Sequence, residues 1–90
     1  MFYIFGKKMD INVFNAIMTS EIVPSESKMV TISILQEYTN PTLKSNDKGE
    51  VWMEASLTDV MQSNISQEDV ETLHKGGWFI DNNVLKLFFN

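Results

Sequence analysis

The C-terminal segment 77–89, GWFIDNNVLKLFF, restricts the possible folds more than any other part of the chain. Hydrophobic residues lie on both sides of Asn82 and Asn83, and asparagine tolerates the positive φ angles that a tight two-residue turn requires. The segment therefore predicts a β-hairpin of strands 77–81 and 84–89. Residues that lie opposite each other in such a pair share one face of the sheet, so the position of the turn also determines which side chains lie together.

A turn at Asn82 and Asn83 sorts the hairpin side chains into two faces. The face expected to point toward the core is apolar throughout and carries Trp78, Ile80, Leu85, Leu87 and Phe89. The other face mixes aromatic and charged side chains and carries Phe79, Asp81, Val84, Lys86 and Phe88. An exposed surface of this second kind often marks a site where a partner binds.

Residues 50–57 show the same alternation and predict another strand. Its inward side is expected to carry Val51, Met53, Ala55 and Leu57. Trp52 falls on the polar side, which is an unusual position for tryptophan. We therefore expect Trp52 to join Phe79, Lys86 and Phe88 in one partner-binding surface. The alternative is that a helix or a loop covers these residues.

Residues 2–38 are predicted to contain two strands and one helix. The aromatic and β-branched stretch 2–5 predicts a short strand, and the alternation of Val30, Ile32 and Ile34 predicts a strand over residues 28–38. Between them, Asp10 is a helix cap and the apolar stripe over residues 10–22 predicts a helix. A return strand over residues 9–14 is the competing interpretation.

The remaining segments contain a loop and capped helices. Residues 39–49 are dense in turn-forming residues and predict a loop that either connects two elements or has a function of its own. Residues 56–59 begin a short helix that ends near Ser63. Residues 66–69 cap a second helix, which is expected to end at Gly76.

Together these elements predict a small single α+β domain over residues 1–90, in the order β-α-β-β-α-β-β. Its sheet is expected to be mainly antiparallel, with two helical segments between the strands. The first six elements match the order of a ferredoxin-like sandwich, to which a C-terminal strand is added. That analogy concerns architecture alone and assigns no function.

Composition makes several functions less favourable. The chain has no cysteine, so it has no disulfide framework and no thiolate ligand for zinc. Its formal charge is −5, and all seven basic residues are lysine. Arginine provides the bidentate contacts that are typical of phosphate and guanine recognition, so its absence disfavours a sequence-specific DNA reader. No stretch approaches the roughly 20 apolar residues of a membrane span, and a cytoplasmic location is expected.

His74 is the only histidine and therefore the first candidate for a general base or a metal ligand. It has no second histidine or cysteine as a co-ligand, and no serine with a recognisable nucleophile context accompanies it. The favoured interpretation is structural: His74 lies in the last turn of a helix, where an imidazolium interacts well with the helix dipole. We expect no catalytic residue, no metal site and no cofactor.

The first functional hypothesis is a non-enzymatic protein-interaction module that binds through an exposed sheet face, such as a small adaptor, inhibitor or accessory protein of the kind common in phages. A homodimer is a further expectation, because the C-terminal strand VLKLFF has the β-propensity to pair with a second copy if it lies at an edge. The alternative is sequence-tolerant binding of single-stranded nucleic acid on the sheet aromatics. The twelve acidic residues oppose that alternative.

Overall fold

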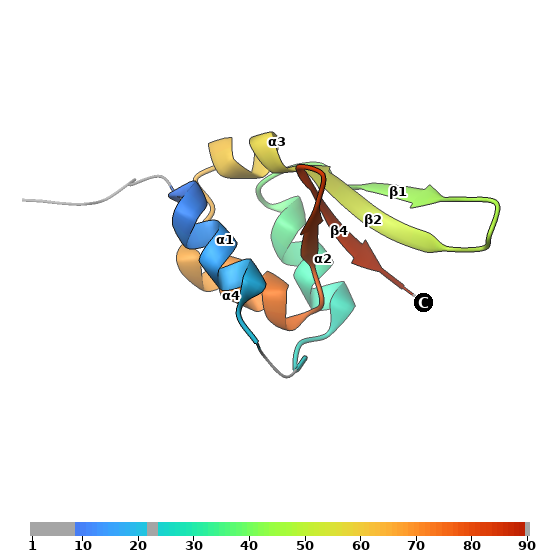
Figure 1. Cartoon of the computed structure of the whole chain (residues 1–90), viewed down its shortest axis with the longest axis horizontal. Helices are drawn as coiled ribbons and strands as arrows, with labels where there is room; N and C mark the ends of the chain where they lie inside the picture. The colour runs from blue at the N-terminus through green and yellow to red at the C-terminus, as the bar shows by residue number, and fades with distance from the viewer. Residues whose placement is uncertain (1–8, 22–23, 90) are drawn as a thin grey trace, which may run out of the picture.

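The computed structural model describes residues 9–21 and 24–89. Its elements are α1 (Ile11–Thr19), α2 (Lys28–Gln36), β1 (Thr42–Ser45), β2 (Val51–Ser56), α3 (Leu57–Gln62), α4 (Gln67–Lys75), β3 (Phe79–Asp81) and β4 (Val84–Phe88). The strands form one antiparallel sheet in the order β1-β2-β4-β3. Figure 1 shows the helices gathered to one side of the sheet, while the β1–β2 hairpin extends beyond them. The predicted α+β class and mainly antiparallel sheet are confirmed.

Each described helix begins at a polar residue whose side chain accepts a hydrogen bond from the first turn. Asp10 Oδ1 accepts from the backbone N–H of Asn12 at 2.7 Å, and Ser66 Oγ accepts from that of Asp69 at 3.1 Å. Ser27 and Ser56 cap α2 and α3 in the same way. These bonds satisfy N–H groups that have no partner within the helix. The helices predicted over residues 10–22 and 66–76 are confirmed as α1 and α4.

The strand predicted over residues 28–38 is wrong, because this segment forms helix α2. Its buried side chains are Thr31, Ile32 and Leu35, a spacing that places them on one side of a helix. The alternation of β-branched residues resembled a strand, but their low helix propensity is a weak preference that tertiary packing overrides. The cap at Ser27 was the sequence signal for the helix.

The loop predicted over residues 39–49 is also partly wrong, because it contains strand β1. Lys44 lies opposite Trp52 in the β1–β2 ladder, and the N–H of Asn46 closes the hairpin on the carbonyl of Glu50 at 3.2 Å. The expected ferredoxin-like order and the count of two helical segments therefore fail in the described residues. The strand predicted over residues 2–5 lies outside them.

The predicted C-terminal hairpin is confirmed with its register, although β3 begins at Phe79 rather than at residue 77 and β4 ends at Phe88. Ile80 lies opposite Leu85, and the turn residues Asn82 and Asn83 have φ angles of 52° and 63°. Gly77 precedes the hairpin at φ 105°, where a side chain would be strained. Positive φ at both turn residues matches the twist of the paired strands, so the turn determines the register.

We expect the turn to be sensitive to which residue replaces Asn83. Asn83→Ala should lower the free energy of unfolding by about 1 kcal/mol, because alanine has no side-chain oxygen to support the left-handed conformation. Asn83→Gly should leave stability unchanged or raise it slightly, since glycine adopts positive φ without strain. Urea denaturation followed by circular dichroism measures both changes. Equal stability of the two variants would contradict the assigned turn.

The core lies between the helices and the inner face of the sheet. Residues buried in it are Phe14, Met18, Ile32, Leu35, Ala55, Leu57, Val60, Ile65, Val70, Leu73, Trp78, Leu85 and Leu87. The inward strand positions expected from the sequence are confirmed at Ala55, Leu85 and Leu87, whereas Phe89 is 37% exposed. Among the described residues, no helix has the length and apolar character needed to cross a lipid bilayer.

Strand β4 lies inside the sheet, between β2 and β3. Its backbone is paired with β2 along its whole length and with β3 over residues 84–86, where Lys86 lies opposite Phe79. The unpaired edge on which the expectation of a homodimer rested is therefore absent along residues 84–86, and the homodimer itself stays a prediction. The edges of the described sheet are β1 and β3.

Candidate functional site

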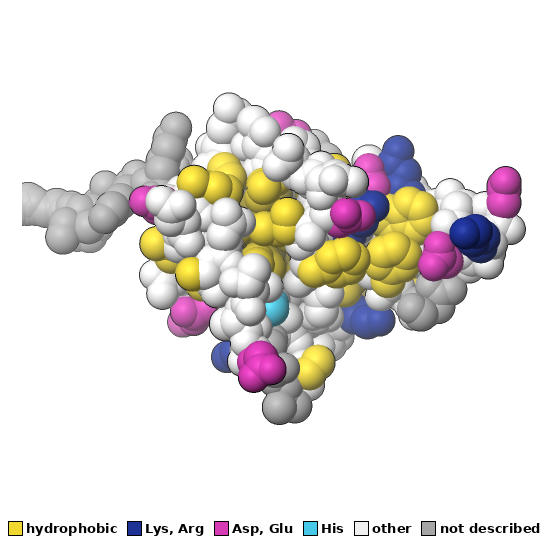
Figure 2. All heavy atoms as spheres, in the orientation of Figure 1, with side chains coloured by type: hydrophobic (Ala, Val, Ile, Leu, Met, Phe, Trp, Pro, Cys, Tyr) yellow, Lys and Arg dark blue, Asp and Glu magenta, His cyan; other side chains and the backbone are white. Residues whose placement is uncertain are grey.

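The four residues predicted to bind a partner lie together on the outer face of the sheet. Trp52 of β2 lies opposite Phe88 of β4, and Phe79 of β3 lies opposite Lys86. Because Lys86 and Phe88 are two positions apart on one strand, their side chains share this face. We call these four residues the aromatic face. Figure 2 shows hydrophobic side chains gathered over the sheet, with basic and acidic side chains beside them.

The three rings of the aromatic face contact one another in sequence across three strands. The centroids of Trp52 and Phe88 are 5.3 Å apart with the rings tilted by 30°. Phe88 and Phe79 are stacked, with centroids 5.8 Å apart and an angle of 14° between the rings. Aromatic pairs at such distances stabilise each other by about 0.5–1.5 kcal/mol beyond the area they bury. The rings therefore hold one another in place.

Polar contacts fix the orientation of the side chains around these rings. Trp52 Nε1 donates a hydrogen bond to Glu54 Oε1 at 2.9 Å, so the indole N–H already has a partner. Lys86 Nζ lies 5.5 Å from the centroid of the Trp52 ring and forms an ion pair with Asp81 Oδ2 at 3.0 Å. Lysine over an indole ring gains a cation–π attraction of about 0.5–1 kcal/mol at exposed sites.

The helices pack against the opposite face of the sheet. Trp52, Phe79 and Phe88 belong neither to the buried core nor to the hydrophobic residues packed against it. Phe79 is 37% exposed, and Trp52 and Phe88 are half-buried, in contact with each other. A cover formed by a helix or a loop was the alternative, and none of the described elements provides it.

Lysines are concentrated around the aromatic face of an otherwise acidic chain. Lys86 belongs to it, Lys44 lies opposite Trp52, and Lys28 Nζ donates to the carbonyl oxygen of Phe88 at 2.8 Å. The carboxylates in contact with it are Glu54 and Asp81. These three lysines and two acids sum to +1, so the other four lysines and ten acids of the chain sum to −6. The counted residues around the aromatic face are thus less acidic than the rest of the chain taken together.

Helices α3 and α4 are joined by the turn 63–66 and precede a hairpin, which is the order of a helix-turn-helix unit. In DNA-binding proteins of this kind the start of the second helix contacts bases in the major groove. Here that start carries Glu68 and Asp69, with Glu71 in the next turn. The carboxylates of α4 would repel the phosphates of duplex DNA.

Asp69 also contacts Tyr38. A hydrogen bond to Asp69 and partial burial raise the pKa of the Tyr38 hydroxyl.

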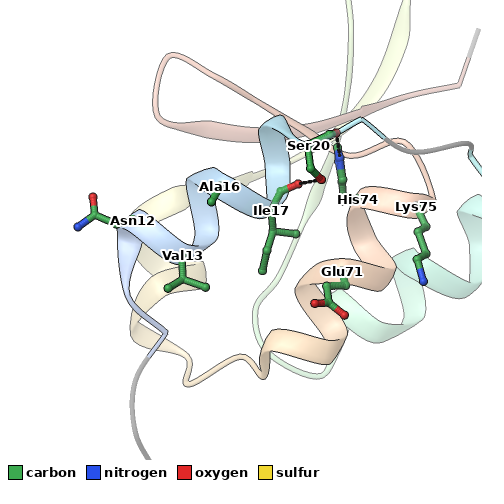
Figure 3. Close-up of a pocket in the computed structure, with 8 residues that line it drawn as sticks. All are labelled: Asn12, Val13, Ala16, Ile17, Ser20, Glu71, His74 and Lys75. Atoms are coloured by element: carbon green, nitrogen blue, oxygen red, sulfur yellow. Dashed lines mark hydrogen bonds between the residues drawn. The ribbon is translucent and has the colours of Figure 1, made fainter.

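A concave region lies between α1 and α4, away from the aromatic face, and was not predicted from the sequence. It has a volume of about 560 Å³, and its walls are Asn12, Val13, Ala16, Ile17, Ser20, Glu71, His74 and Lys75. Figure 3 shows these side chains on the two facing helices. The stripe of apolar residues on α1 was visible in the sequence. Its pairing with α4 was not, because the two helices are about fifty residues apart in the chain.

His74 connects the ends of these two helices. Its Nε2 lies 2.7 Å from the backbone carbonyl oxygen of Ser20, a contact drawn in Figure 3. Because a carbonyl oxygen only accepts, Nε2 is the protonated nitrogen and donates this bond. The other nitrogen, Nδ1, is buried and has no hydrogen-bond partner among the described residues. A general base needs an accessible free nitrogen, so this geometry supports a structural role.

Gly76 and Gly77 end helix α4 through a defined set of backbone bonds. The N–H of Trp78 donates to the carbonyl of Leu73 at 3.2 Å, and the N–H of Gly77 donates to that of His74 at 3.1 Å. This is the Schellman arrangement, in which the residue after the cap has a positive φ. The sequence-based interpretation of the glycines as a helix end is confirmed, with Gly77 rather than Gly76 at positive φ.

Groups of three or more histidine and acidic side chains close enough to hold a metal ion do not occur within residues 9–21 and 24–89. Comparison of the chain with protein-family models, with curated proteins and with solved structures finds no match. The geometry of the aromatic face is therefore the basis on which a function is proposed.

Proposed function

We propose that this chain is a non-enzymatic protein-interaction module that binds its partner through the aromatic face. The observation that carries the proposal is the contiguous stack of Trp52, Phe88 and Phe79 on a sheet surface that none of the described helices covers. Contiguous apolar patches on a protein surface often mark sites where a partner protein binds.

The chemistry of the aromatic face is that of an interface hot spot. Tryptophan and tyrosine are enriched among the residues whose truncation weakens complexes most, and such residues lie at the centre of an interface within a polar rim. Trp52 is the tryptophan of the aromatic face, and the polar side chains Lys86 and Glu54 lie beside it. Because its indole N–H is bonded and its ring is packed on Phe88, binding costs little side-chain entropy.

Capture from a lysate of the source cell tests this proposal. A partner retained by the tagged wild-type chain should bind Trp52→Ala at least about thirtyfold more weakly, the loss expected for a hot spot. Phe79→Ala should weaken binding as well. Ile11→Ala is the matched control, because Ile11 is 42% exposed and Phe79 is 37% exposed, yet Ile11 lies on helix α1. Retention of the partner by both aromatic variants would refute the proposal.

Single-stranded nucleic acid is a second candidate ligand, favoured by the position of Lys86 beside three rings of the sheet. Bases stack on exposed aromatic side chains with little dependence on sequence. The net charge of −5 opposes this mode of binding. Titration with an oligothymidylate at low salt, followed by the fluorescence of Trp52 in a Trp78→Phe background, decides it. Unchanged fluorescence at high oligonucleotide concentration excludes this second candidate.

A further inference from the structure

Strand β1 leaves one row of backbone groups without a partner. The N–H of Asn46 bonds the carbonyl of Glu50, and residues 44 and 42 continue this set of bonded pairs at alternate positions. The N–H and C=O groups of Leu43 and Ser45 therefore point away from β2. Because β1 is the outermost strand, no other strand of the described sheet meets them. These four groups form an edge that is open to another strand.

The surroundings of this edge are free of helices. All four residues of β1 are exposed, and Leu43 is 64% exposed although it is apolar. Figure 1 shows the β1–β2 hairpin extending beyond the helices. On the inner side of the hairpin Leu43 lies opposite Met53, beside the half-buried Val51 and the exposed Phe89. An added strand with apolar side chains on this side would extend an apolar strip that is already present.

The outer side of the same edge carries one positive charge on β1, while Glu54 lies on the neighbouring strand opposite Thr42. Lys44 is the only charged residue of β1, and it lies opposite Trp52. A strand added next to β1 would place every second side chain on the side of Lys44, with β1 between these side chains and Trp52. Opposite charges on neighbouring strands attract, so carboxylates are favoured at those positions.

We propose that the partner binds as an extended segment that adds a β-strand to β1, with carboxylates beside Lys44 and apolar side chains beside Leu43. This inference rests on the proposed function and names the chemistry of the partner. The added strand gains backbone hydrogen bonds from Leu43 and Ser45, and its outer side chains lie beside Lys44 on the side of the sheet that carries the aromatic face. Affinity then comes from the main chain and specificity from the alternation of side chains.

Two other arrangements fit the same edges less well. Strand β3 is also an edge, but with three residues it offers fewer outward groups than β1. A second copy of this chain could pair β1 with itself about Leu43, which would place Thr42 rather than a carboxylate opposite Lys44. An acidic, alternating segment of another protein satisfies both sides of β1.

Amide hydrogen exchange measured by NMR tests the strand addition. The probe is a capped seven-residue peptide of alternating glutamate and valine. In the free protein the amide of Lys44 should exchange slowly, because it bonds to β2, whereas those of Leu43 and Ser45 should exchange fast. Saturating peptide should slow exchange of the Leu43 and Ser45 amides about tenfold or more. A valine–lysine peptide and a backbone N-methylated glutamate–valine peptide should leave both unchanged.

Variants at Leu43 separate the backbone contribution from the side chain. Leu43→Pro removes the outward N–H but leaves the bonds to β2 intact, because proline is tolerated where the N–H of an edge strand faces solvent. It should weaken peptide binding about tenfold. Leu43→Thr keeps the N–H and a β-branched side chain, so it should weaken binding less. Equal binding by Leu43→Pro and the wild type would overturn the inference.

The outcomes distinguish this inference from the proposed function. If the captured cellular partner is lost with Trp52→Ala but bound normally by Leu43→Pro, the aromatic face binds and the strand addition is refuted. Normal binding by both variants refutes both proposals. Protection of Leu43 that rises with protein concentration, in the absence of peptide, would overturn the inference in favour of self-pairing. Protection by an oligonucleotide alone would overturn it in favour of nucleic acid.

Discussion

Replacing Trp78 with alanine should lower the free energy of unfolding by about 3–5 kcal/mol, the cost of removing a large buried ring from a packed core. Trp78 is 1% exposed and lies among core residues from all four described helices. Its Nε1 also donates a hydrogen bond to Thr31 Oγ1 at 2.9 Å, so the ring joins the residue before β3 to α2. For a domain of this size the loss is a large fraction of the total stability. Urea denaturation followed by far-ultraviolet circular dichroism measures it.

Trp52→Ala is the matched control for this change. Both substitutions remove an indole ring, but Trp52 is half-buried on the outer face and lies outside the core. Its stability cost should stay at about 2 kcal/mol or below, because it loses the ring contact with Phe88 and only part of the apolar area of a fully buried ring. The two tryptophans should thus separate stability from partner binding. A stability cost for Trp52→Ala that equals the cost for Trp78→Ala would contradict the assignment of Trp52 to a free surface.

Strict alternation is the pattern that allowed much of the candidate site to be predicted. The pair Asn82 and Asn83 fixed the register of β3 and β4, and the register placed Phe79, Lys86 and Phe88 on one side. Strand β2 then aligned with β4 so that Trp52 met Phe88. Local turn chemistry and period-two patterning act over a few residues, which is why they can be read from the sequence.

The same reasoning failed where tertiary packing decided between two structures. In residues 28–38 the β-branched residues alternate as in a strand. Thr31, however, accepts a hydrogen bond from the buried Trp78, a residue 47 positions later in the sequence, and local patterning does not reveal such a contact. Strand β1 was missed because its four residues, TLKS, carry no strand pattern and pair only by virtue of β2. The open edge of β1 and the groove between α1 and α4 depend on these long-range pairings.

The junction of α2 and α4 leads to a second stability prediction, at Gly76. Its φ of −86° and ψ of −6° suit any residue, so backbone strain does not require glycine there. Glycine is required because there is no room for a side chain: a Cβ atom at Gly76 would overlap the Cγ2 methyl group of Thr31, which is fully buried. Gly76→Ala should therefore lower the free energy of unfolding by about 1–3 kcal/mol, the usual cost of overpacking.

A double-mutant cycle with Thr31→Ser isolates this steric cause. Serine keeps the Oγ that accepts from Trp78 Nε1 and removes the methyl group that a new Cβ would meet. Thr31→Ser alone should cost about 1 kcal/mol for one buried methyl group. The double variant should be more stable than the sum of the single effects implies, by at least about 1 kcal/mol, since residues in contact are not additive. Strictly additive effects would show that Gly76 is needed for a reason other than its contact with Thr31. Because α2 was the helix mistaken for a strand, a measured coupling between Thr31 and Gly76 would also be direct solution evidence that residues 28–36 pack against the end of α4.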